Sequence, residues 1–215
     1  MGVDATPIPA GISGNTAGTM LARIDRDVIS KKPTWMTLNC GINDTSGTPV
    51  DKFRDNIEKI VDRATAAGIK VILMNTTIAA QENLDCDDSR KRLQYCEEFK
   101  KLAAERNLIL VDLNTALTRE LLERRKDDPK GPIILCDGTH PNGLGYQIIA
   151  AEILHALGVS ESDIAALRKR WDDYPFAVAK PIVAVGDLLK LNARAAKNGK
   201  TVEDQISEIL TNSVK

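Results

Sequence analysis

The feature that most constrains the fold of this chain is a regular alternation between short apolar runs and longer amphipathic stretches. Three apolar runs have the length and composition of buried strands, and each precedes a segment whose apolar residues recur at helical spacing. The predicted strands cover residues 34–40, 69–77 and 108–113. Because a helix between two strands forms a crossover that leaves them parallel, the pattern predicts an α/β fold with a parallel sheet. Ligands of such sheets bind where strands end, so the loops after strands are candidate sites.

The amphipathic stretch between the first two predicted strands shows the helical periodicity most clearly. Its apolar residues fall on one stripe, and Gly68 ends the pattern. The stripe consists of Phe53, Ile57, Ile60, Val61 and Ala64. We expect this stripe to cover one face of the sheet.

The alternation stops near residue 160, and the rest of the chain contains predicted helices without core strands between them. We therefore expect an α/β domain over residues 1–158 and a helical C-terminal extension over residues 159–215. The extension's helices are predicted near residues 160–172, 188–198 and 202–211, with Leu189, Ala193, Ile206 and Ile209 buried. A helical pair this short is marginal alone, so we expect it to dock on the domain or to form a homodimer.

Charge and cysteine content exclude several classes of partner. The 215 residues carry 29 Lys and Arg against 30 Asp and Glu, so no overall field attracts nucleic acid or an anionic membrane. No segment approaches the ~18 apolar residues of a membrane span, and the N-terminus lacks a signal-peptide pattern, so we predict a soluble chain. The four cysteines show no metal-ligand spacing and are interpreted as free buried thiols, with a Cys86–Cys96 pair as the alternative in an exported protein.

The stretch "CDGTHPN" places Asp137 three positions before His140, one of only two histidines. A histidine accepts a proton near neutral pH most effectively when a carboxylate holds one of its ring nitrogens. The alternative is a surface loop in which Asp137 caps a turn and His140 has no chemical part. The other histidine, His155, is predicted to lie on a helix face.

Two other polar stretches, "GISGNT" and "GIND", contain candidate donors to an anion. "GIND" follows the first predicted strand, where the side-chain amide of Asn43 is placed to donate to a developing oxyanion. Backbone N–H groups of the turn at Gly14 are expected to form an anion-receiving pocket before a helix. The alternatives are an ordinary turn and an ordinary helix cap.

The three stretches in this order resemble the SGNH (GDSL) hydrolase superfamily of esterases and lipases, over about residues 8–158. The resemblance implies a flavodoxin-like three-layer α/β/α fold and a Ser-His-Asp triad that needs no metal or cofactor. By motif position, His140 is the general base and Asp137 orients it. Gly14, through its backbone N–H, and Asn43, through its side-chain amide, are the oxyanion-hole donors.

The family's nucleophile is a serine in a Gly-Asp-Ser block at the end of an earlier strand, but only ten residues precede Gly11 here. We therefore expect the serine to lie in a missing N-terminal segment. Ser13 is a weaker alternative because it lacks the pattern of a nucleophile elbow. A Cys-His pair through Cys40 or Cys136 is a further alternative, although both thiols are interpreted as small apolar groups at strand ends.

Near the C-terminus, the apolar run 181–185 precedes Gly186 and Asp187 and so resembles the absent block, with Leu188 where the serine would stand. A core that starts at Gly11 would leave the predicted strand 34–40 without a neighbour on one side, and this run is a second way to supply that neighbour. Alternatively, Asp187 caps a helix. The same ending resembles ribbon-helix-helix modules, which suggests a DNA-binding or dimerising part. Its balanced charges argue against phosphate contacts.

The function expected from this resemblance is ester hydrolysis through an acyl-enzyme. The substrate classes are a small acyl ester or an acetylated carbohydrate, and the aromatic content of 4% disfavours a long groove that stacks sugar rings. The rival expectation is a catalytically inactive SGNH-like binding protein that keeps the cleft without the chemistry.

Overall fold

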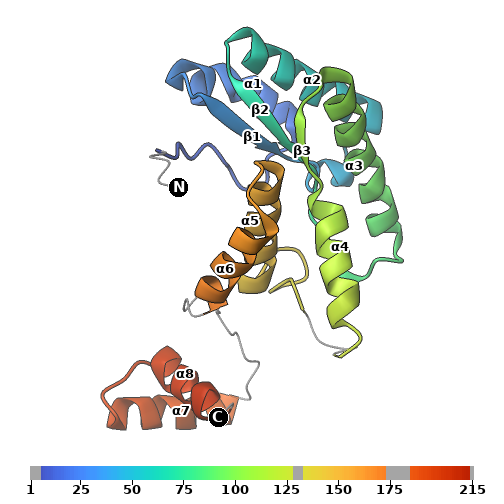
Figure 1. Cartoon of the computed structure of the whole chain (residues 1–215). Helices are drawn as coiled ribbons and strands as arrows, with labels where there is room; N and C mark the ends of the chain where they lie inside the picture. The colour runs from blue at the N-terminus through green and yellow to red at the C-terminus, as the bar shows by residue number, and fades with distance from the viewer. Residues whose placement is uncertain (1–5, 128–132, 173–184, 214–215) are drawn as a thin grey trace. The chain divides into compact units, whose positions relative to one another are not determined.

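The computed structural model of the chain describes residues 6–127, 133–172 and 185–213. The first part of the chain contains a sheet of three described strands, β1 (Trp35–Asn39), β2 (Lys70–Met74) and β3 (Ile109–Val111) (Figure 1). The strands are parallel and lie in the order β1-β2-β3, with Trp35 opposite Lys70 and Ile72 opposite Ile109. The three predicted strands and their parallel arrangement are therefore confirmed.

Alternate residues of β2 point to opposite sides of the sheet, so both faces present apolar side chains. Helices cover both of these faces. Val71 and Leu73 join one apolar cluster, whereas Ile72 and Met74 join the other. The first cluster is completed by α1 (Ala17–Asp27), α2 (Val50–Ala66) and α3 (Asp87–Arg106), and the second by α4 (Leu113–Arg124) and α5 (Gly143–Ala156). The chain thus has the three-layer α/β/α architecture that the sequence predicts.

The apolar stripe predicted between the first two strands is the buried face of α2. All five of its residues are at most 1% exposed. Phe53 packs edge-to-face on Tyr95 and Phe99 of α3, with ring centroids 4.9 and 5.6 Å apart. Gly68 follows the helix with a positive φ of 77°, as a helix-ending glycine should.

The chain divides into two compact units, Met1–Ala177 and Val178–Lys215. The boundary predicted after residue 158 lies inside the first unit, because α6 (Glu161–Asp172) packs on α5 and belongs to that unit. The predicted cap of α6 is present, since the Asp163 N–H donates to Ser160 Oγ at 3.2 Å.

The second unit is a helical pair of α7 (Val185–Lys197) and α8 (Val202–Ser213). The prediction that Leu189, Ala193, Ile206 and Ile209 are buried is wrong. Leu189 and Ala193 are exposed, Leu189 at 63%, and the two isoleucines of α8 are half-buried. Ala195, on another face of α7, is the residue that is buried, at 1%. α7 therefore turns its other side toward α8, and the Asn198 side chain beyond its end donates to Gln205 Oε1 at 2.6 Å.

A strand is a possible prediction for the apolar run 181–185. Residues 181–184 of this run lie outside the described residues, and Val185 is the first residue of α7. Asp187 is accordingly inside the first turn of α7, so the prediction that it caps a helix is wrong. The homodimer predicted through this part of the chain stays a prediction.

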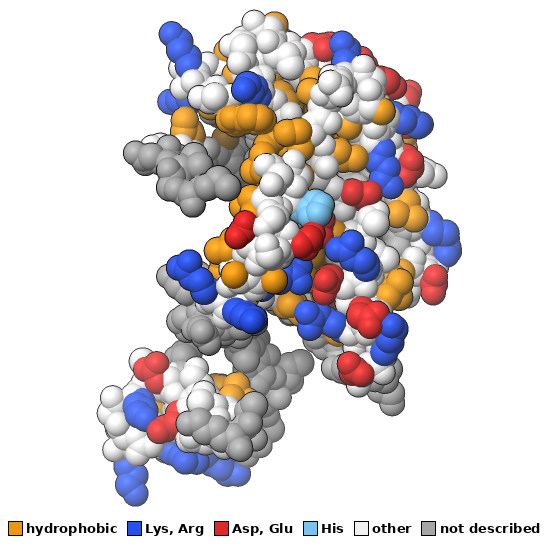
Figure 2. All heavy atoms as spheres, viewed as in Figure 1, with side chains coloured by type: hydrophobic (Ala, Val, Ile, Leu, Met, Phe, Trp, Pro, Cys, Tyr) orange, Lys and Arg blue, Asp and Glu red, His pale blue; other side chains and the backbone are white. Residues whose placement is uncertain are grey.

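Charges of both signs are mixed on the surface. On the face shown in Figure 2, Lys and Arg side chains lie among Asp and Glu side chains over α3 and α4. None of the helices in the described ranges combines the length and the apolar character that a bilayer crossing requires.

Candidate active site

The loop before α1 and the loop after β1 form the first half of the candidate site. Gly14 has a φ of 76°, a conformation that glycine adopts without steric cost, and it turns the chain toward the start of α1. The Asn43 side-chain amide donates to the Asn15 carbonyl oxygen at 3.0 Å. An amide nitrogen carries two hydrogens, so Asn43 keeps a second donor beside the Gly14 turn. The structure thus brings these two predicted residues together.

Asp44 connects the two loops of this half, because it contacts the start of α1. It is fully buried, and both carboxylate oxygens lie 3.1 Å from the backbone nitrogen of Ala17, the first residue of α1. Burial raises the pKa of the Asp44 carboxyl above its ordinary value. The loop is also fixed from α3, because the Tyr95 hydroxyl donates to the Thr48 carbonyl oxygen. Sequence reasoning passed over Asp44, although its place beside Asn43 after a buried strand was a signal.

The second half is the loop that carries Asp137 and His140. His140 Nδ1 lies 2.8 Å from Asp137 Oδ2, while Asp137 Oδ1 accepts the backbone N–H groups of His140 at 2.8 Å and Thr139 at 3.0 Å. The His140 N–H, the imidazole and the Thr139 N–H hold the pKa of the Asp137 carboxyl well below its usual range. A carboxylate at Nδ1 favours the proton on that nitrogen and leaves Nε2 free as a base.

The ends of this loop are braced against each other. Leu135 forms a β-bridge with Pro141, and the Cys136 N–H donates to the His140 carbonyl oxygen at 2.9 Å. Directly after the loop, Asn142 caps α5 by accepting the Gly145 N–H at 3.0 Å. The histidine is consequently held in a closed loop at the start of a helix.

The cysteines depart in part from expectation. Each of the four thiols is free, and Cys40 and Cys96 are buried as predicted. Cys136 is exposed and Cys86 half-buried, so the prediction that all are buried is wrong for these two. Cys136 is exposed because it lies in the braced loop rather than at a packed strand end.

A strained turn after β2 contacts the histidine loop. Ala80, Gln81 and Glu82 have positive φ values of 55°, 55° and 63°, which costs non-glycine residues roughly 1–2 kcal/mol each. The Gln81 N–H donates to the Gly138 carbonyl oxygen at 2.9 Å, and a Cβ at Gly138 would lie 2.7 Å from Gln81 Cγ. Sequence reasoning missed this turn, because a segment without glycine gives no sign of left-handed backbone.

Both halves lie at the carboxyl edge of the sheet. Asn43 follows β1, and the turn that holds the histidine loop follows β2. The two exits also approach each other, since a Cβ on Gly41 would lie 3.5 Å from Thr76 Cβ. This is the edge at which parallel α/β sheets bind ligands.

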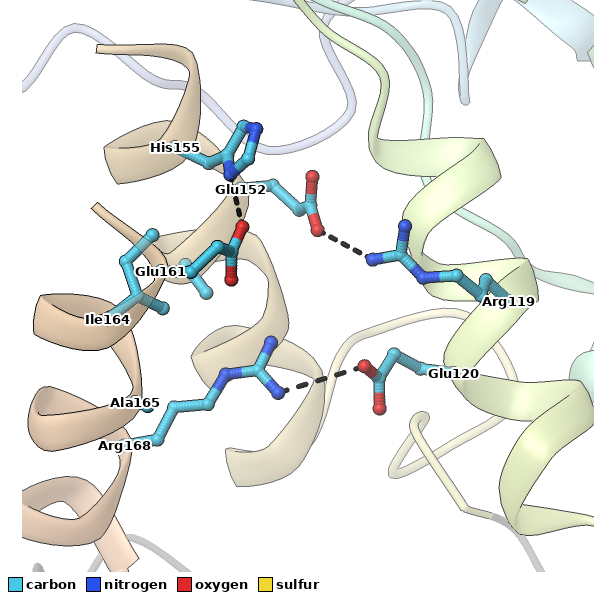
Figure 3. Close-up of a pocket in the computed structure, with 9 residues that line it drawn as sticks. Arg119, Glu120, Glu152, His155, Glu161, Ile164, Ala165 and Arg168 are labelled. Carbon is cyan, nitrogen blue, oxygen red and sulfur yellow. Dashed lines mark hydrogen bonds and ion pairs between the residues drawn. The ribbon is translucent and has the colours of Figure 1, made fainter. Parts of the chain in front are cut away.

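His155 lies elsewhere, near the C-terminal end of the α5 helix as predicted, whereas His140 lies in the loop before the first residue of that helix. It borders a small pocket of about 240 Å³ between α4, α5 and α6 (Figure 3). The charged side chains there pair with one another. The pairs are His155–Glu161 at 2.6 Å, Arg119–Glu152 at 2.9 Å and Arg168–Glu120 at 3.7 Å. In the described parts of the chain, no group of three or more acidic, cysteine or histidine side chains is placed to hold a metal ion.

Known proteins share this fold and sequence pattern. An acetylxylan esterase from Geobacillus stearothermophilus is 29% identical over 160 residues, which cover 69% of this chain and 70% of that protein. Its crystal structure matches with a TM-score of 0.61 at 28% identity, over 70% of this chain and 71% of that one. A further acetyl xylan esterase structure matches with a TM-score of 0.63 at 26% identity, over 69% of this chain and 79% of that one.

Three other structures of the Geobacillus enzyme are described as catalytic mutants, in which alanine replaces a serine, an aspartate or a histidine. The sequence itself matches the GDSL-like Lipase/Acylhydrolase family over residues 2–148, well over half of its length. The chain therefore belongs to the GDSL-like lipase/acylhydrolase family.

Proposed function

We propose that this protein is a serine ester hydrolase that removes acetyl groups from an acetylated carbohydrate. The family and the acetylxylan esterase relatives support ester hydrolysis. The observation that carries the finer proposal is the 2.8 Å contact between His140 Nδ1 and Asp137 Oδ2. The catalytic aspartate and histidine of the Geobacillus esterase are likewise three positions apart.

In the proposed reaction, His140 Nε2 takes the proton of a serine hydroxyl as its oxygen attacks the ester carbonyl. Asp137 keeps the imidazole in the required tautomer and stabilises its cationic form. The carbonyl oxygen becomes an oxyanion, which accepts hydrogen bonds from the Gly14 N–H and the Asn43 amide. The imidazolium then protonates the departing sugar oxygen, which leaves as a hydroxyl. His140 next takes a proton from a water that attacks the acetyl-enzyme, and it returns this proton to the serine oxygen as acetate leaves.

The serine in this proposal is carried by a strand that precedes Gly11 and pairs with β1. Among the described strands, β1 pairs on one side only, with β2. A groove of about 1010 Å³, lined in part by Ile8, Trp35 and Met36, runs along β1. A strand in this groove would satisfy the free edge and cover its apolar lining, which native proteins seldom leave open.

The substrate proposal follows the relatives, which are described as acetylxylan and acetyl-xylooligosaccharide esterases. An acetyl group makes few apolar contacts and demands only a small acyl pocket. The low aromatic content of 4% favours short acetylated oligosaccharides over a long stacked polymer.

The test uses the complete reading frame that contains this sequence, expressed from its natural start. We expect a fluorophosphonate probe to label a serine N-terminal to Gly11, and acetate to be released from acetylated xylooligosaccharides. His140→Ala should abolish both, while His155→Ala, the matched control, should leave both unchanged. An expressed protein that the probe does not label and that releases no acetate would instead support the alternative, a catalytically inactive binding protein.

A further inference from the structure

The Glu82 side chain, at the end of the strained turn after β2, is buried in the first unit with only 3% of the residue exposed. Its carboxylate pairs with Arg125 Nη2 at 3.2 Å. A buried carboxylate is retained only where other groups replace its hydration, so its remaining partners indicate what it does.

Those partners are three successive backbone N–H groups. Glu82 Oε1 accepts from Leu135 at 2.8 Å and from Ile134, and both carboxylate oxygens lie 3.0 Å from the nitrogen of Ile133. Convergence of consecutive amides on one anion is a nest, and here the anion belongs to the protein itself. The nest lies immediately before the loop that carries Asp137 and His140.

The connection from this carboxylate to the imidazole is short and continuous. Leu135, held by Glu82, forms the β-bridge with Pro141, and the next residue, Cys136, donates to the His140 carbonyl oxygen. The neighbouring Gln81 grips the middle of the same loop through the Gly138 carbonyl. One strained turn therefore fixes both the base and the tip of the histidine loop.

We propose that Glu82 is a positioning residue, which sets the orientation of His140 by anchoring the backbone of Ile133, Ile134 and Leu135. The catalytic meaning of this inference rests on the proposed hydrolase function. This role explains the left-handed conformation at residues 80–82, because that conformation directs the Glu82 carboxylate toward the three amides. Ile134 and Leu135 are themselves in the apolar core, so loss of the anchor should displace the loop before it unfolds the domain.

The decisive variant is Glu82→Gln, which keeps the size of the side chain but removes the negative charge and replaces one acceptor oxygen with an NH2 group. Either the amides or Arg125 then lose an acceptor, because the two carboxylate oxygens of Glu82 serve both. Glu82→Asp keeps the charge and shortens the reach by one methylene. The matched control is Glu152→Gln, which also removes a carboxylate from an arginine pair, on α5 beside Arg119.

The readout is ¹⁵N–¹H NMR of the imidazoles at about pH 8, where ordinary histidines are neutral. The chain has two histidines, so His155 is an internal control. We expect the wild type to hold the His140 proton on Nδ1. In Glu82→Gln this preference should be lost, with partial recovery in Glu82→Asp, no change in Glu152→Gln, and no change at His155.

Unaltered His140 signals in a folded Glu82→Gln variant overturn the inference. If both Glu82 variants fail to fold, hydrogen exchange of the wild-type protein decides: slow exchange of the Ile133–Leu135 amides supports the anchor, and exchange as fast as in exposed loops refutes it. In the complete hydrolase we expect kcat to fall about 10²-fold with KM little changed. The NMR result does not depend on turnover, so failure of the hydrolase proposal is seen separately, as absent acetate release with an intact His140 tautomer.

Discussion

The two halves of the candidate site are each fastened by a buried carboxylate that accepts backbone N–H groups, but they differ in how those carboxylates are encoded. Asp44 adjoins Asn43 in the sequence and binds the first N–H of α1. Glu82 comes from a turn more than fifty residues before the amides it binds. The half that contains Gly14 and Asn43, here called the oxyanion half after its proposed role, is thus held by a residue next to Asn43. The half that contains Asp137 and His140, here called the histidine half, is held by a distant segment.

The halves also differ in exposure. Asn43 sits on a loop whose neighbours Asp44 and Thr45 are buried, whereas the His140 and Asp137 side chains are 68% and 55% exposed. An exposed Asp–His pair needs other contacts to keep one geometry, because solvent offers competing hydrogen bonds. The buried half needs less, since packing already restricts it.

The largest expected effect of a single substitution is in the histidine half. In the proposed hydrolase, His140→Ala should lower kcat for acetate release by about 10⁴-fold or more, because the proposed serine nucleophile would lose its base. Steady-state assays with acetylated xylooligosaccharides measure this, and circular dichroism verifies that the variant is folded. Loss of activity in the His155→Ala control to a similar extent would show that the assignment is mistaken.

A smaller effect is expected in the oxyanion half. Asn43→Ala removes one donor to the tetrahedral oxyanion and should reduce kcat about 10²- to 10³-fold. The thermal midpoint should change little, because Asp44 and Tyr95 hold the loop independently of this amide. Full turnover in the variant would remove Asn43 from the oxyanion hole.

These differences explain what the sequence could and could not predict. Features set by residues close together in the chain can be predicted from the sequence. They include the alternation of strands and helices, the α2 stripe and the Asp137–His140 contact. The contact between Glu82 and the amides before the histidine loop joins distant segments and leaves no periodic trace. The burial of Leu189 on α7 is predicted wrongly for the same reason, because the sequence of an amphipathic helix does not show which other element packs against it.

The pH dependence of stability should have opposite sign in the two halves. Asp44 has a raised pKa in the folded chain, so its contribution is present below the ordinary pKa of about 4 and is lost as the pH rises through the raised value. Asp137 has a lowered pKa, so its contribution is present above about pH 4 and is lost as the pH falls through the lowered value.

Urea unfolding of the wild type, Asp44→Asn and Asp137→Asn across this pH range measures both contributions. Relative to Asp44→Asn, the wild type should lose free energy of unfolding as the pH rises. Relative to Asp137→Asn, it should lose free energy of unfolding as the pH falls. Parallel curves for all three proteins would contradict the assigned environments of the two carboxyls.

The smallest effect, and the simplest to observe, concerns the thiols that immediately precede each motif. Cys40 precedes Gly41 in the oxyanion half and is buried, which raises its pKa well above the ordinary value; Cys136 precedes Asp137 and is exposed. Because the thiolate is the reactive form, iodoacetamide should modify Cys136 in the folded protein and spare Cys40 until urea unfolds the chain. Peptide mass spectrometry assigns each modified site. Equal modification rates of the two thiols in the folded protein would mean that the loop after β1 opens as freely as the histidine loop, and that the packing around Asp44 does not hold the oxyanion half closed.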